Sequence, residues 1–217
     1  MSQSRSRVAV NFDFQPTLTG GLLLVQPLVR SDFEALYTVA SDPLIWEQHP
    51  AHDRWQHEVF SALFERLLAS GGGLVVRERA TGEVLGSSSF YEYHETARDV
   101  VVGYTFLARC CWGGLFNREL KSLMLEHAFK FVDRVWFHVA VNNFRSQRAM
   151  DKVGAILSHH VVRESGGVTA EFIHYYIDRP STDFAGERSR RNSGHTASSS
   201  RSMARFIGPR RRSASRP

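Results

Sequence analysis

Residues 98–129, RDVVVGYTFLARCCWGGLFNRELKSLMLEHAF, decide the fold of this chain. A β-type run over 98–108 leads to the adjacent glycines Gly113 and Gly114, and a segment with apolar residues at helical spacing follows. Glycine lets a backbone approach a ligand closely, and the first turn of a helix leaves its N–H groups unpaired. The stretch therefore predicts a strand, a glycine turn and a helix whose N-terminus can bind an anion, often a phosphate.

Two common phosphate sites do not fit these residues. A P-loop needs Lys-Ser or Lys-Thr after its second glycine, where this chain has Leu115-Phe116. A dinucleotide fold needs a G-x-G-x-x-G run and an acid at the end of the next strand, where this chain has Asn142-Asn143. What remains is a pyrophosphate bound by backbone amides alone, with the adjoining strand free to bind a further, extended part of the ligand.

The rest of the chain predicts a mixed order of elements. Hydrophobic periodicity and turn residues indicate, in order, a strand at 22–29, helices at 31–42 and 54–69, strands at 73–80, 84–93 and 98–108, a helix from Gly113, a strand at 134–141, a helix at 144–154, and a closing hairpin of 155–164 with 168–178. Ser31 or Asp32 is the expected N-cap of the first helix. Antiparallel strands with one βαβ crossover predict an α+β, mixed three-layer α/β/α domain.

Charge separates the chain into a body and a tail. Residues 181–217 carry nine arginines against two acids, a net of +7, whereas the remaining residues carry 18 basic and 20 acidic side chains, a net of −2. The Arg/Ser-rich tail has few large apolar residues, so we expect it to be disordered. Its aromatic content does not suit base stacking, so a role in nucleic-acid binding is not favoured. We expect an N-terminal arm at 1–19, partly ordered, and one domain at 20–180.

The composition also narrows the cellular setting. Cys110 and Cys111 are the only cysteines, and an adjacent pair alone builds neither a disulfide framework nor a zinc site. The first residues lack the apolar core of a signal peptide, and no apolar run has membrane-spanning length. We therefore expect a cytoplasmic protein without a metal and without membrane contact, as a monomer or homodimer.

Two segments carry a resemblance to a known family. The order of elements, the stretch 102–129 and NNFRSQRAMDKVGA at 142–155 resemble the GNAT superfamily of acyl-CoA-dependent N-acyltransferases, over about residues 20–178. The nearest branch by resemblance is that of the ribosomal-protein N-terminal (RimJ/RimL-like) acetyltransferases. The resemblance implies a GNAT-like fold with a central, mostly antiparallel sheet. It also implies transfer of an acetyl group from acetyl-CoA to a primary amine on a protein N-terminus, a peptide or a small molecule.

The same resemblance implies where the cofactor would bind. The pyrophosphate would lie on the amides of Gly113 to Arg118, and the pantetheine arm would add to the edge of strand 98–108. In the family pattern Gln/Arg-x-x-Gly-x-Gly/Ala, the aligned positions of this chain are Trp112, Leu115 and Asn117. The implied cofactor-binding residues are Phe106, Leu107, Trp112, Gly113, Gly114, Leu115, Phe116, Asn117, Arg118 and Asn143.

Direct acyl transfer needs an oxyanion donor, a proton for the thiolate and a base for the amine. By resemblance, Ser146 would protonate the thiolate, and a backbone N–H on strand 98–108, near Tyr104 to Phe106, would bind the oxyanion. The base stays open among Glu92, His94, His138 and Glu164, or water, because the usual acid position holds Val101. Trp46, His49 and Trp55 would border the acceptor pocket, although packing against the second helix explains them equally well. The alternatives are a CoA-binding module without catalysis and a nucleic-acid-associated protein acting through its tail.

Overall fold

The structure is a computed structural model, and it describes residues 11–165 and 168–181 of the 217-residue chain. Within these ranges it contains the α-helices α1 (Phe33–Ala40), α2 (His57–Ala69), α3 (Leu115–Ala128) and α4 (Phe144–Val153), and the 3-10 helices η1 (Arg30–Asp32), η2 (Pro43–Ile45) and η3 (Arg109–Cys111). The tail expected at 181–217 lies outside the described residues apart from Ser181, and so do residues 1–10 of the expected arm.

In the same ranges, eight strands form one sheet in the order β1-β2-β3-β4-β5-β6-β8-β7. The strands are β1 (Leu18–Thr19), β2 (Leu23–Pro27), β3 (Gly73–Glu78), β4 (Val84–His94), β5 (Asp99–Leu107), β6 (Arg134–Ala140), β7 (Ile156–Ser165) and β8 (Val168–Asp178). Neighbouring strands are antiparallel except for β5 and β6, which run parallel and are joined by α3. The predicted βαβ crossover and the mostly antiparallel sheet are therefore confirmed.

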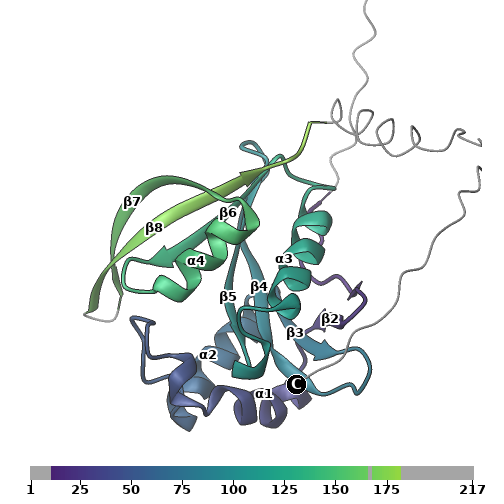
Figure 1. The fold of residues 1–217 in the computed structure, drawn as a ribbon, viewed down its shortest axis with the longest axis vertical. Coiled ribbons are helices and arrows are strands. Elements are labelled where there is room, and N and C mark those ends of the chain that lie inside the picture. The colour runs from purple at the N-terminus through teal and green to yellow at the C-terminus, as the bar shows by residue number, and fades with distance from the viewer. Residues whose placement is uncertain (1–10, 166–167, 182–217) are drawn as a thin grey trace, which may run out of the picture. The chain divides into compact units, whose positions relative to one another are not determined.

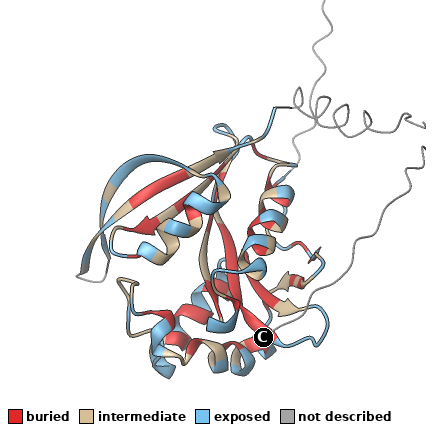
Figure 2. Ribbon diagram, viewed as in Figure 1, coloured by how far each residue is buried: buried red, intermediate tan, exposed pale blue. Residues whose placement is uncertain are grey.

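Different helices cover the two faces of the sheet (Figure 1). Successive side chains of a strand point to opposite faces, and β3 shows the result. Leu74 and Val76 belong to a core with Leu120 of α3 and Met150 of α4, whereas Val75 belongs to a core with α1 and α2. Figure 2 shows the buried residues along the strands and on the inner sides of the helices. This is the three-layer arrangement that the sequence predicted.

Two local predictions at helix starts need correction. The second helix was expected from residue 54, but α2 begins at His57 because Gln56 is extended, with φ −74° and ψ 136°. Asp32 does precede α1, yet its side chain does not cap that helix. Its carboxylate accepts instead from the Val29 N–H at 3.0 Å and from Arg77 at 2.5 Å, so it fastens η1 to β3.

The expected arm contributes to the core in its described part. The Phe12 side chain is 6% exposed, and its ring centroid lies 5.2 Å from that of Phe90 and 5.8 Å from that of His127. Nε2 of His127 donates to the Asp13 carbonyl at 2.7 Å. Burial of an aromatic ring contributes roughly 2 kcal/mol, so this segment is part of the folded body from about Phe12 onward. None of the helices in residues 11–165 and 168–181 has the length and apolar character that a bilayer span requires.

Candidate functional site

A cleft opens where β5 and β6 part. The two strands are paired over Asp99–Val101 and Arg134–Trp136. Beyond Val101, the described part of β5 makes no further pairs with β6. The backbone N–H and C=O groups on that edge of β5 are therefore available to an extended ligand that contains amide groups. The cleft has a volume of about 1010 Å³ and lies among the ends of β5 and β6, the starts of α3 and α4, and the segment 45–49.

A β-bulge shapes the β5 side of the cleft. Ser87 and Ser89 of β4 pair with Phe106 and Gly103, so three steps along β5 match two steps along β4. Tyr104 lies at the extra step with φ +50°, a conformation that costs a non-glycine residue about 1–2 kcal/mol. Such bulges redirect backbone N–H groups out of the ladder. Tyr104 lies in the stretch of β5 where we expected, by resemblance, the oxyanion donor.

The N-terminus of α3 forms the second wall. Gly114 occupies the N-cap position without a side-chain cap, and Gly113 before it has φ +67°. Leu115, the first helical residue, is 65% exposed, so its side chain is not packed into the core. Nε1 of Trp112 donates to the Leu107 carbonyl at 2.9 Å and ties this turn to the end of β5. The unpaired amides and the helix dipole suit an anion here.

The N-terminus of α4 closes the cleft from the other side. Oδ1 of Asn143 accepts from the Ser146 N–H at 3.1 Å, so Asn143 is the N-cap of α4 as predicted. The Ser146 side chain is half-buried at the cleft. The Arg145 guanidinium lies 3.9 Å over the Trp112 ring and donates to the Ile45 carbonyl at 2.6 Å. Burial lowers the pKa of Arg145, and nearby Glu47 opposes that shift.

The charged side chains that α3 and α4 contribute to the cleft are positive. Besides Arg145, the cationic side chains that α3 and α4 contribute to the cleft are Arg118, Lys121, Arg148 and Lys152. Lys121 is the exceptional one, because its side chain is buried among apolar groups. Its Nζ donates to Oγ1 of Thr105 at 3.1 Å and lies 5.2 Å from the centre of the Phe137 ring. Burial lowers the pKa of Lys121 from 10.5 to about 8.

The segment 45–54 borders the opposite end of the cleft. Trp46 is buried, its Nε1 donates to the Ala40 carbonyl at 2.7 Å, and its ring lies 5.1 Å from that of Phe106. His49 stands edge-on to Trp46, with ring centroids 6.1 Å apart. Both side chains line the cleft, whereas Trp55 is 41% exposed and lies outside its lining. The structure therefore brings two of the three expected acceptor-side residues together.

One of the four candidate bases lines the cleft. His138 stands beside the parting strands, and its Nδ1 lies 3.3 Å from the Tyr91 hydroxyl. Its ring stacks on that of His174 at 3.8 Å. Burial, followed by the neighbouring His174, lowers the pKa of His138 to about 3, so its imidazole is neutral near pH 7. His94 instead pairs with Asp99 at 2.7 Å on the surface.

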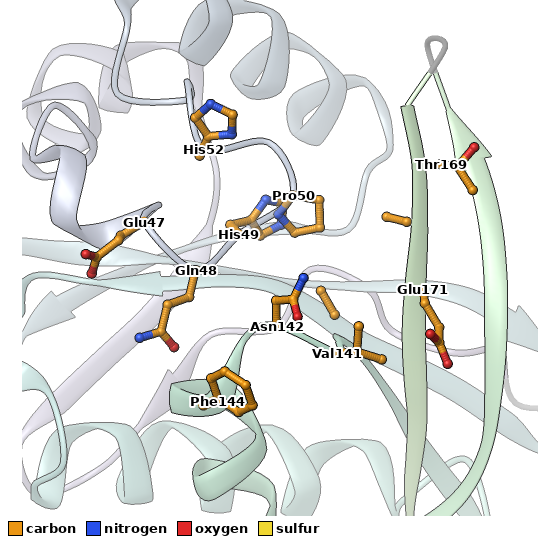
Figure 3. A pocket seen from close by; sticks show the side chains of 12 residues that line it. Glu47, Gln48, His49, Pro50, His52, Val141, Asn142, Phe144, Thr169 and Glu171 are labelled. Atoms are coloured by element: carbon orange, nitrogen blue, oxygen red, sulfur yellow. The ribbon is translucent and has the colours of Figure 1, made fainter.

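A smaller pocket of about 700 Å³ adjoins the cleft, and we call it the side pocket (Figure 3). The segment 47–52 forms one wall, and the end of β6 with Asn142 forms another. Thr169, Ala170 and Glu171 of β8 form the third wall. Four residues line both the side pocket and the cleft, so the two spaces adjoin along Glu47, Gln48, His49 and Ala140.

The structure assembles most of the residues that the sequence singled out. Those that line the cleft are Trp46, His49, Tyr104, Phe106, Leu107, Trp112, Gly113, Gly114, Leu115, Asn117, Arg118, Asn143 and Ser146. Phe116 does not line it, because its side chain packs on the core under α3. Lys121, Arg54 and Arg145 were not predicted. Lys121 follows Asn117 by four positions and precedes Met124 by three, so helical spacing could have placed it on the inner face. Among the described residues, no group of three or more His, Cys, Asp or Glu side chains is arranged to bind a metal.

Comparisons with known proteins agree with this geometry. Residues 22–156 match the family model described as an acetyltransferase (GNAT) domain. A putative acetyltransferase from T. thermophilus is 25% identical, with a TM-score of 0.66 over 86% of this chain and 100% of that one. No curated protein sequence matches significantly.

Two solved structures with bound ligands share the fold at lower identity. Mycobacterium smegmatis RimJ in complex with CoA-disulfide is 19% identical, with a TM-score of 0.59 over 73% of this chain and 82% of that one. Spermidine N-acetyltransferase from Vibrio cholerae, in complex with CoA and spermine, is 18% identical, with a TM-score of 0.57 over 73% and 96% of the two chains.

Proposed function

The chain belongs to the GNAT acetyltransferase family, and on that premise we propose that it transfers an acetyl group from acetyl-CoA to a primary amine by direct attack of the amine on the thioester. The observation that carries the proposal is the cleft itself. The uncapped N-terminus of α3 and the unpaired edge of β5 both border this cleft. The bulge at Tyr104 would lie between the proposed cofactor site at these elements and the proposed acceptor site at Trp46 and His49.

Acetyl-CoA has three parts that match three parts of the cleft. The amides after Gly113 and the positive charge around α3 and α4 suit its phosphates. The free edge of β5 over Phe106 and Leu107 suits the amide groups of the pantetheine arm, which can pair as an added strand. Asn143, which caps α4 through Oδ1, presents its remaining amide N–H groups for the same arm. The thioester would then lie close to the bulge.

The chemistry follows from the groups around that position. A backbone N–H near Tyr104 is released from the ladder by the bulge and would donate to the tetrahedral oxyanion. The Ser146 hydroxyl would protonate the departing thiolate as the C–S bond breaks. Water is the group that we favour as acceptor of the amine proton, because a pKa of about 3 makes the His138 imidazole too weak a base near pH 7. With direct attack, no acyl-enzyme forms.

The finer assignments belong to the same proposal. We place the chain near the RimJ/RimL-like branch because Asn143, Ser146 and Gly154 keep the spacing of that branch, and because α4 is capped by Asn143 and ends at Gly154 with φ +74°. The acceptor would be the amine of a protein N-terminus, a peptide or a small molecule. A cytoplasmic monomer or homodimer would supply this activity.

The test uses the full chain and two measurements. Isothermal titration with acetyl-CoA and with CoA measures cofactor binding, and a thiol-release assay over a panel of primary amines measures turnover. We expect binding and turnover with at least one amine class. Binding without turnover on any amine would indicate a CoA-binding module, and the absence of heat with either cofactor would overturn the proposal.

A further inference from the structure

Two hydrogen-bond donors face each other beside the bulge. Nδ1 of His49 accepts from the Ala51 N–H at 2.9 Å, so the neutral imidazole carries its proton on Nε2. Nε2 lies 3.2 Å from Nη1 of Arg54, which is also a donor and has no lone pair. Burial, followed by the charge of Arg54, lowers the pKa of His49 to about 3, and loss of the Nδ1 proton is therefore the stable state. The Nε2–H of His49 and an N–H of Arg54 are therefore close together, and no acceptor in the described residues satisfies them both.

Arg54 lacks a carboxylate partner in the described part of the chain. Its guanidinium lies 5.6 Å from the centre of the Trp46 ring, and its close polar neighbour in the described residues is Nε2 of His49, itself a donor. Burial lowers the pKa of Arg54 to about 10. Asp53 and the Tyr104 hydroxyl oppose that shift only in part and make no hydrogen bond or ion pair with the guanidinium. Arg54 is half-buried, and a guanidinium partly withdrawn from water without a paired carboxylate is costly, so proteins normally pair it.

We propose that the acceptor amine carries a carboxylate, and that Arg54 and His49 bind that carboxylate. This inference rests on the proposed acetyl transfer. One carboxylate oxygen would accept from Nε2–H of His49 and from Arg54, and the planar fork of Arg54 would hold the second oxygen. The ligand then supplies both the missing acceptor and the missing negative charge. The substrate class is an amino acid, or a peptide with an acidic side chain near its N-terminus.

The position of the pair separates it from the cofactor. Arg54 and His49 lie by Trp46, whose ring touches Phe106 at the bulge, whereas the anion site for the cofactor lies at the start of α3. In Figure 3 the ring of His49 stands at the meeting of the 47–52 segment and Asn142, where the side pocket joins the cleft. A carboxylate at this point leaves its amine free to face Tyr104 and the thioester.

Other charges in the side pocket are already engaged. Glu171 accepts from Nδ1 of His160 at 2.7 Å, and Glu47 interacts with Arg145. Neither carboxylate is paired with Arg54. The two faces of His49 therefore differ: the acids toward the side pocket interact with other residues, and the guanidinium of Arg54 has no carboxylate partner among the described residues.

The first experiment compares matched acceptors with the wild-type chain. One series pairs each free amino acid with its carboxamide, and a second pairs C-terminally amidated dipeptides that have Asp or Asn at the second position. We expect the carboxylate member of at least one series to have a kcat/KM about 10-fold higher or more. The series that responds identifies the source of the carboxylate.

This comparison is biased against the proposal, which makes a positive result informative. A neighbouring carboxylate raises the pKa of an amine, so at pH 7.5 the amide has the larger fraction of neutral, nucleophilic amine. A preference for the carboxylate must then come from binding. Equal or higher kcat/KM for the uncharged member in both series would overturn the inference.

The second experiment uses Arg54→Gln, Arg54→Lys and the exposed control Arg30→Gln. We expect Arg54→Gln to lose the preference for the carboxylate through KM, Arg54→Lys to keep part of it, and Arg30→Gln to keep all of it. Acetyl-CoA affinity, measured by titration, should stay within about 2-fold in each variant if only the acceptor side is altered. An unchanged preference in a folded Arg54→Gln variant would overturn the assignment of Arg54.

The two proposals fail in different ways. If acetyl transfer itself is wrong, no acceptor gives thiol release, whether or not acetyl-CoA gives heat. If only this inference is wrong, thiol release occurs but does not depend on the carboxylate.

Discussion

The guanidinium of Arg145 lies 3.9 Å over the indole ring of Trp112 and thereby joins the start of α4 to the turn before α3. The same guanidinium donates to the carbonyls of Leu44 and Ile45, at 3.3 and 2.6 Å. One side chain therefore holds three walls of the cleft together, and it places a positive charge beside the expected phosphate site.

We expect Arg145→Gln to weaken acetyl-CoA binding about 10-fold, because it removes a charge-assisted contact and the stacking on Trp112. Arg145→Lys keeps the charge but not the planar stack and should lie between the two. Isothermal titration measures the effect, with the exposed Arg79→Gln as control. An unchanged affinity in Arg145→Gln would remove Arg145 from cofactor binding.

Ser146→Ala should lower kcat about 10- to 100-fold while acetyl-CoA affinity changes little, because the hydroxyl is required only when the thiolate leaves. The N-cap of α4 survives the change, since Asn143 accepts from the backbone N–H of residue 146 and not from its side chain. Thiol release under saturating acetyl-CoA gives kcat. Ser122→Ala, an exposed position on α3, is the control. Wild-type turnover in Ser146→Ala would exclude this role.

Hydrophobic periodicity was enough to predict the order of the elements, because spacing on a helix or strand is a local property. The glycines at 113–114 and the cap at Asn143 were predictable for the same reason, since backbone conformation at a helix end depends on a few neighbouring residues. The start of α2 was not, because Trp55 and Gln56 are acceptable helical residues, and the hydrogen bond from the Tyr37 hydroxyl to the Trp55 carbonyl, at 3.3 Å, comes from another helix.

The charges of the site could not be predicted in this way. Arg54 is the first residue of the helix expected at 54–69, in the polar stretch AHDRWQHE, and it is half-buried because Trp46 and Tyr104 lie near it from other elements. Helical spacing places Lys121 on the inner face of α3, but the burial of its amine depends on Thr105 and Phe137, which come from other elements. Burial of a charge depends on which distant residues meet around it, and a single sequence does not show this.

Gly113→Ala should destabilise the chain by about 1 kcal/mol, because Gly113 has φ +67° and a side chain there is strained. Gly114→Ala is the matched control. Gly114 has φ −109°, and an added Cβ would meet its nearest neighbour, the Trp112 carbonyl, at 3.8 Å. Chemical denaturation gives both free energies of unfolding. Equal losses in the two variants would show that the positive φ at Gly113 is not required.

The stacked imidazoles of β6 and β8 predict an acid-sensitive sheet. Burial first, and neighbouring charge second, lowers the pKa of His138 to about 3 and that of His174 to about 4, with His159 and Arg163 as the neighbouring groups. The unfolded chain binds these protons near pH 6.5, and the folded chain binds them only at lower pH. The free energy of unfolding that depends on the two histidines is therefore at its maximum above pH 6.5 and falls as the pH drops below that value.

His174→Leu should make this pH dependence shallower. Nε2 of His174 is buried without a hydrogen-bond partner in the described residues, so the substitution should cost little or even stabilise the chain at pH 7. Urea unfolding at pH 7.5, 6 and 5 measures the slope, with the exposed His52→Leu as control. A slope identical to that of the wild type would contradict the assignment to this pair.

Lys121→Met should stabilise the chain at pH 7. Burial lowers the pKa of Lys121 from 10.5 to about 8, so the charged amine is less stable in the folded chain, at a cost on the order of 3 kcal/mol. The unfolded chain binds more protons between about pH 8 and 10.5, and wild-type stability should therefore rise over that range. The gain from Met should shrink correspondingly and be smallest above pH 10.5. Thermal unfolding at pH 7, 8.5 and 10 measures this pH dependence. Lys130→Met, at an exposed position after α3, is the control and should show no such dependence.

The buried amine of Lys121 lowers stability, and it lies beside the proposed cofactor cleft. We therefore expect the amine to contribute to the site, so the stabilised Lys121→Met variant should bind acetyl-CoA more weakly. A stabilised variant with full affinity and full turnover would show that the buried charge has no part in the reaction.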